Sequence, residues 1–143
     1  MKAFWTVVNV TGIIVFGTFA FLQRNDVDPA RYHDPSRLDS LLWIGFYGLI
    51  ALMFAFALGK RFSVWLLGAA TLFCLIEMAM TLRGLIQNLS GDEGFVLTGV
   101  QMSARRPWVE QSREFFGALI ALAASGLLWR QRWSWKRFAA AEK

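Results

Sequence analysis

The chain has 143 residues, of which 56% are hydrophobic and 15% aromatic, and its formal net charge is +5. The length fits one domain, but the apolar content is above that of ordinary soluble domains. The basic residues flank apolar runs and form no single polar patch, which argues against nucleic acid as a partner. These features favour a membrane protein whose first partner is the lipid bilayer.

Three apolar runs are long enough to cross a membrane, which takes roughly 20 mostly apolar residues. They cover residues 3–22, 41–59 and 62–82, and the third contains a single ionisable acid, Glu77. The first run is longer than the apolar part of a cleaved signal peptide and lacks an A-x-A site. We interpret it as a retained signal-anchor helix.

A fourth apolar run, residues 115–129, is shorter and must extend into the polar PWVEQSRE before it to span a bilayer. We therefore predict an all-α membrane protein with four transmembrane helices in an up-down bundle, forming one domain over residues 1–143. The predicted helices cover residues 3–22, 35–59, 62–83 and 107–130, with outer loops at 23–34 and 84–106 and a tail at 131–143.

The Trp residues lie at or near the predicted helix ends, the level of the lipid headgroups that indoles prefer. We predict that they are interface anchors; they are Trp5, Trp43, Trp65, Trp108, Trp129, Trp133 and Trp135. The basic, aromatic tail is interpreted as a helix end that anchors topology, and the alternative is a segment that binds anionic lipid.

Lys and Arg divide almost evenly between the two sides, so their number barely discriminates between orientations. Every Lys is on the side of the termini, whereas most acids share the other side with Arg. We therefore predict that both termini are cytoplasmic and that the protein lies in the bacterial inner membrane.

The first outer loop belongs to the polar stretch QRNDVDPARYHDPSR, residues 23–37. Asp28 and Asp34 each precede a Pro, a pattern typical of helix starts, and we expect Asp34 to cap the second helix. The alternative is an oxygen-rich site for calcium or another hard cation that uses Asn25, Asp26 and Asp28. The loop lacks the EF-hand pattern, because Ala30 and Arg31 stand where that pattern needs an acid or amide and then Gly. No cofactor is predicted.

Glu77 would be costly against lipid, so we expect its carboxylate to face the inside of the bundle. Glu114 opens the short fourth run and needs polar partners for the same reason. We predict an outer ionic cluster that closes the bundle or holds a ligand. Its candidate members are Gln23, Asn25, Asp26, Asp28, Arg31, Asp34, Glu77, Arg83, Arg113 and Glu114.

Small residues recur every fourth position on two predicted helices, which lets helix backbones approach closely. They are Ala51, Ala55 and Gly59 on the second helix, and Gly117, Ala121 and Ser125 on the fourth. They can serve contacts within the bundle or with another protein. The tripeptide Asn88-Leu89-Ser90 matches a glycosylation acceptor, which matters only in a secretory lumen.

Two short patterns resemble the transmembrane protein 220 family of small four-helix membrane proteins. These patterns are Gln23-x-Asn25-Asp26-x-Asp28-Pro29 after the first helix and Arg113-Glu114-x-x-Gly117 at the start of the last. The family has Pro between the two Asp, where this chain has Val27, and a shorter loop before Leu42-Trp43-Ile44. The resemblance implies architecture and assigns no activity.

No nucleophile elbow, phosphate loop or metalloprotease motif occurs in the sequence. We expect a non-enzymatic accessory or scaffold subunit that packs against other membrane protein subunits. The alternative is a cation or proton binding or transport protein that uses Asp28, Glu77 and Glu114. A membrane hydrolase or transferase with paired carboxylates is a third, less favoured class.

Overall fold

The computed structural model describes residues 2–25, 36–91, 94–97 and 106–141, and within these residues every regular element is helical. The elements are α1 (Lys2–Leu22), η1 (Gln23–Asn25), α2 (Arg37–Leu58), α3 (Val64–Ser90) and α4 (Pro107–Ala141). Three of them, α1, α2 and α3, are long and apolar enough to cross a membrane. The longest helix, α4, is more polar and is not among these three.

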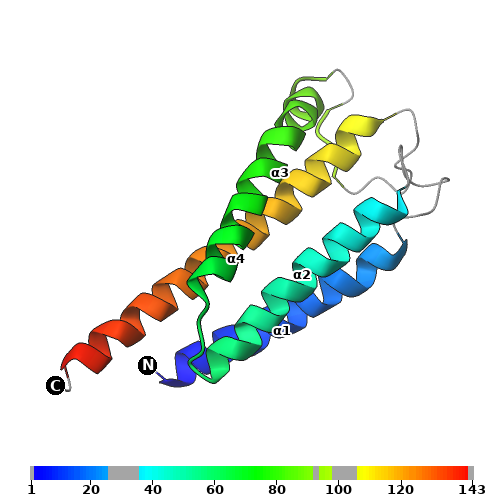
Figure 1. Ribbon diagram of the computed structural model, residues 1–143. Coiled ribbons are helices and arrows are strands. Elements are labelled where there is room, and N and C mark those ends of the chain that lie inside the picture. The colour runs from blue at the N-terminus through cyan, green and yellow to red at the C-terminus, as the bar shows by residue number, and fades with distance from the viewer. Residues whose placement is uncertain (1, 26–35, 92–93, 98–105, 142–143) are drawn as a thin grey trace.

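The helices form two antiparallel hairpins (Figure 1). Helix α1 packs mainly on α2, and α3 packs mainly on α4. The two hairpins contact each other less extensively, and α2 makes most of the contacts between them. The start of α1 and the end of α4 lie at one end of the molecule, which we call the terminal end, and the last turns of α1 and α3 lie at the opposite, outer end (Figure 1).

Serine residues cap the second and third helices. The Ser36 hydroxyl accepts a hydrogen bond from the Asp39 backbone N–H at 3.4 Å, and the Ser63 hydroxyl accepts one from the Leu66 N–H at 3.4 Å. The expectation that Asp34 caps the second helix is therefore wrong. The capping oxygen has to sit three residues before the bonded amide, a position that Ser36 occupies at the start of α2. Asp34 itself lies outside the described residues.

Helix α3 continues to Ser90, although the sequence predicted an end at residue 83. The buried residues Thr81, Gly84, Leu85 and Asn88 recur at spacings of three and four, so one face keeps packing past Arg83. A charged residue at the edge of the apolar run does not end a helix whose buried face continues. The first part of the predicted loop 84–106 is consequently helical.

Helix α4 continues to Ala141, so the predicted break at residue 130 is also wrong. Cations lie over the Trp rings of neighbouring turns, with Arg132 at 5.8 Å from Trp129 and Arg137 at 3.5 Å from Trp133. The Trp135 ring packs at 6.2 Å against Phe62, which precedes α3. These contacts stabilise successive turns of the helix, so the polar tail stays helical.

The α1/α2 hairpin is joined by aromatic rings. Phe16 stacks on Phe54 at 6.0 Å, and Phe19 meets Tyr47 edge-on at 5.4 Å. Gly12 makes room for this packing, because a Cβ atom there would lie 2.6 Å from the Phe54 ring. The cluster extends to α3 through Phe46 and Phe73 and so couples the two hairpins.

Large apolar side chains cover the outside of the molecule. The most exposed include Val7 (65%), Ile14 (63%), Leu41 (64%), Leu72 (59%) and Met80 (71%). Exposure of such a surface to water is unfavourable, whereas contact with the hydrocarbon of a bilayer is favourable. The exterior therefore agrees with the lengths of α1, α2 and α3 in indicating several membrane crossings.

Candidate functional site

An acidic pair lies where the two hairpins meet. Glu77, half-buried in α3, has as its electrostatic neighbour Asp39, in the first turn of α2. Partial burial makes a negative charge on Glu77 costly, and the negative charge of Asp39 adds to that cost. Asp39 also takes part in an interaction within the chain.

The inward orientation predicted for Glu77 agrees with its partial burial. Arg83 is exposed. The sequence contained Asp39 among the outer acids, yet it gave no reason to place this residue beside Glu77. Only the crossing of α2 and α3 brings them together.

The other candidate members of the ionic cluster have mixed outcomes. Arg113 is exposed and Glu114 is half-buried, and both take part in interactions with other residues. The backbone carbonyl of Gln23 accepts a hydrogen bond from the Ser40 hydroxyl at 2.7 Å, which ties η1 to α2. Asn25 ends η1. Asp26, Asp28, Arg31 and Asp34 lie outside the described residues, so the complete cluster stays a prediction.

A hydrogen-bonded network at the outer end of α3 was missed by the sequence reasoning. The Asn88 side-chain amide donates to the Val96 carbonyl at 2.9 Å and to the Ser112 hydroxyl at 3.0 Å, and its oxygen accepts from the Val96 N–H at 3.3 Å. Asn88 is 2% exposed. It therefore joins α3, α4 and the segment between them, and its buried amide is not accessible for glycosylation in the folded chain. An Asn in an apolar helix was the available signal.

Three buried polar side chains make no hydrogen bond within the described part of the chain: Asn9 in α1, and Ser125 and Gln131 in α4. Both side-chain atoms of Gln131 are in this state. Helix α4 thus carries buried polar groups toward the terminal end as well as at its start. The sequence signalled Asn9 by its position as the one amide within the first apolar run.

The small residues on α4 face the protein interior. Ala121 and Ser125 are fully buried, and a Cβ atom at Gly117 would collide with the Tyr47 hydroxyl of α2. On α2, Ala51 and Ala55 are half-buried, and Gly59 lies in the turn after the helix. The small residues on α4 therefore serve contacts within the chain, which is one of the two uses that the sequence left open for them.

The Trp residues divide into three groups by the exposure of their side chains. Trp65 and Trp133 are exposed by 88% and 58%, as lipid-facing indoles would be, and Trp108, Trp129 and Trp135 are half-buried. Trp5 and Trp43 are only 8% and 4% exposed. The rings of the latter two pack against other side chains, and the Trp43 ring lies 5.3 Å from that of Tyr47. The role of the Trp residues as interface anchors stays a prediction.

The described residues include no cluster of three or more His, Cys, Asp or Glu side chains that could hold a metal ion. The acids proposed for a hard cation, Asp26 and Asp28, lie outside the described part, so that alternative stays a prediction. Cys74 is buried in α3, where a free Cys packs as a small apolar side chain.

The long apolar helices, the exposed apolar surface and the buried polar groups between helices define a multi-pass α-helical membrane protein. The model of the transmembrane family 220 (helix) matches residues 15–130, and the chain belongs to this family. The matched range contains the whole of α2 and α3, most of α4 and the last eight residues of α1. No curated protein and no solved structure was found to match the chain.

Proposed function

We propose that the protein is a non-enzymatic accessory or scaffold subunit that binds another membrane protein through one face of α2. The observation that carries this proposal is the open space beside Gly45 and Gly48: a Cβ atom at either position meets no heavy atom within 4 Å. The same face presents Leu41 and Leu52, which are 64% and 48% exposed. Together they form what we call the glycine face of α2.

Glycine lowers helix stability by roughly 1 kcal/mol relative to Ala and gives lipid nothing to pack against. Its advantage in a membrane helix is that a second helix backbone can approach closely. The small residues on α4 already serve this purpose inside the chain, whereas the glycine face of α2 has no such partner in the described structure. A helix of another membrane protein subunit fits it.

The proposal also includes how the helices are oriented in the membrane. We infer that α4 is the fourth membrane span, since it runs antiparallel along α3 over most of its length (Figure 1). Its apolar run, residues 115–129, then lies within the bilayer beside α3, and its basic tail extends past the lipid surface. The up-down bundle, the cytoplasmic termini and the bacterial inner membrane stay predictions that follow from this arrangement.

The test is to extract the protein in mild detergent from the membranes of the cells that produce it, and to measure the native mass and composition of the extracted particle. We expect a particle heavier than the chain with a constant companion, and we expect Gly45→Leu and Gly48→Leu to release that companion. Gly17→Leu on α1 is the matched control, because a Cβ there also meets nothing within 4 Å. A wild-type chain that always runs alone would contradict the proposal, and a particle made only of this chain would replace it with self-assembly.

The Asp39–Glu77 pair favours a second candidate, a protein that binds or moves a proton or cation. Glu77 is an ionisable acid at a half-buried position of a helix that can cross the membrane, the type of residue that marks proton and ion pathways. The test is proton or monovalent-cation flux into liposomes that contain the purified chain. Glu77→Gln and Asp39→Asn are expected to abolish flux, while Glu110→Gln, an acid at the start of α4, is expected to leave it intact. Equal flux in all variants would remove this candidate.

A further inference from the structure

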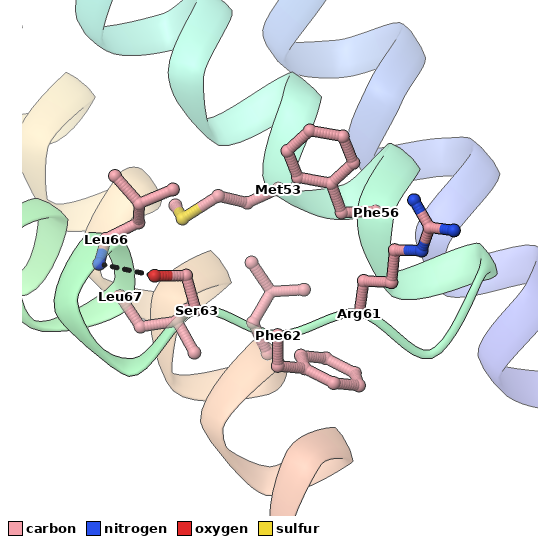
Figure 2. Close-up of a pocket in the computed structure, with 8 residues that line it drawn as sticks. Met53, Phe56, Arg61, Phe62, Ser63, Leu66 and Leu67 are labelled. Carbon is pink, nitrogen blue, oxygen red and sulfur yellow. Dashed lines mark hydrogen bonds between the residues drawn. The ribbon is translucent and has the colours of Figure 1, made fainter.

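A small pocket lies at the terminal end, where the turn between α2 and α3 meets α4. Figure 2 shows its lining: Met53 and Phe56 near the end of α2, Arg61 and Ser63 in the turn, and Leu66 at the start of α3. Leu128 of α4 also contributes to the lining. The hollow is shallow: its enclosed part holds about one water, and the rest of it is open to the surroundings, so a ligand would lie across its mouth. Most of its wall is therefore apolar, and one side of it carries a cation.

The backbone of the turn fixes the position of that cation. The Arg61 N–H bonds to the Phe56 carbonyl at 2.9 Å and the Lys60 N–H to the Ala57 carbonyl at 3.1 Å, the paired bonds of a Schellman motif. Lys60 has a φ of 60°, the left-handed conformation that this motif requires and that Gly usually supplies. The motif ends α2 and sets the direction in which Arg61 leaves the helix.

Arg61 is exposed, and within the described residues no carboxylate pairs with it. The neighbouring Lys60 adds positive charge, with its ammonium 4.8 Å from the centre of the Trp135 ring. The mouth of the pocket is therefore positive, and its cation is available to an anion from outside the chain.

Depth separates the charged part of the pocket from its apolar part. Arg61 lies between two helices that can each cross the membrane, which places it at the level of the lipid headgroups. Met53 lies five residues before the end of α2 at Leu58, which at 1.5 Å per residue is roughly 7 Å deeper. A ligand that fits both parts needs an anionic group at the surface and an apolar chain below it.

We propose that this pocket binds one glycerophospholipid with an anionic headgroup from the adjacent leaflet. The Arg61 guanidinium binds the phosphate, a group that its fork of N–H donors suits, and an acyl chain lies along Met53, Phe56 and Leu66. Anionic lipid is also drawn to this end by the basic residues of the α4 tail. Those residues attract lipids in general, whereas the pocket selects one of them.

The experiment is native mass spectrometry of the full chain in detergent, after incubation with equal amounts of phosphatidylglycerol and phosphatidylcholine with the same acyl chains. One bound phosphatidylglycerol is expected, retained at least about five-fold over phosphatidylcholine. Arg61→Gln should remove this preference. The matched control is Arg130→Gln, an exposed cation at the same end that does not line the pocket, and it should keep the preference.

Two further variants test the two parts of the pocket and keep the test decisive if Arg61→Gln does not fold. Arg61→Lys keeps the charge but loses the fork, so its preference should be intermediate. Phe56→Ala shortens the apolar wall and should lower total lipid retention while phosphatidylglycerol stays preferred.

Three results would overturn the proposal. Equal retention of the two lipids would show that no anionic site exists. Equal loss in Arg61→Gln and Arg130→Gln would assign the effect to diffuse surface charge. Displacement of the lipid by soluble glycerol 3-phosphate at equal concentration would make the pocket a site for a soluble phosphate.

Discussion

The two hairpins are both antiparallel helix pairs, but different chemistry joins them. Rings of Phe and Tyr hold α1 to α2, with Gly12 admitting the Phe54 ring. Side-chain hydrogen bonds and small residues hold α3 to α4, as in the Asn88–Ser112 bond and the buried Ala121. Lipid is as apolar as the helices, so neither pair is driven together by the hydrophobic effect. Shape complementarity serves one pair and polar bonding serves the other.

The largest effect should come from Gly12→Ala in the α1/α2 hairpin. The added methyl collides with the ring of Phe54, which is 2% exposed and held by its neighbours. We expect a loss of about 2–3 kcal/mol in the free energy of unfolding, the usual scale of overpacking. Titration with a denaturing detergent, followed by circular dichroism, measures it.

Gly17→Ala is the control for this prediction, with the same substitution on the same helix. Its Cβ meets nothing within 4 Å. The gain in helix propensity should then stabilise the chain by up to about 1 kcal/mol. If the two variants changed stability equally, ring packing would not be what joins α1 to α2.

In the α3/α4 hairpin, Asn88→Ala should cost about 2 kcal/mol, because it removes three hydrogen bonds and leaves the Val96 backbone without its partner. Amide hydrogen exchange at Val96 should accelerate together with the loss of stability. The neighbouring exposed Gln87→Ala serves as control. Unchanged exchange at Val96 in Asn88→Ala would show that the loop does not depend on this side chain.

The turn that links the hairpins should respond more weakly. Lys60→Ala loses the contact with Trp135 but keeps the left-handed φ, whereas Lys60→Gly loses the contact and relieves the backbone. The Gly variant is expected to be about 1 kcal/mol more stable than the Ala variant, since that is the cost of the left-handed conformation for a residue with Cβ. Equal thermal stabilities of the two variants would count against this turn geometry.

The smallest effect concerns the junction between the hairpins. Glu77→Gln should stabilise the chain by about 0.5 kcal/mol, because it removes a partly buried carboxylate and its repulsion from Asp39. An ion pair between Glu77 and a cation would give the opposite sign. Unfolding of the two chains side by side in one detergent determines that sign.

Much of the architecture followed from the sequence. Apolar runs predicted three spans, now found as α1, α2 and α3, because the length and polarity of a segment decide whether it can cross hydrocarbon. The family resemblance, carried by residues near Gln23 and Arg113, is confirmed by the match over residues 15–130. Helix ends were less predictable, since the buried face that extends α3 to Ser90 becomes visible only beside α4.

The candidate sites depended more on tertiary structure. Glu77 could be recognised as an acid in an apolar run, but its neighbour Asp39 is far away in the sequence. The pocket at Arg61 combines α2, a turn and a side chain from α4, which no local pattern brings together. The sequence by itself determined that the protein is a multi-pass membrane protein, because hydropathy is a property of each segment. Only the tertiary structure decided which polar groups meet, because helix crossing and rotation depend on how facing side chains fit.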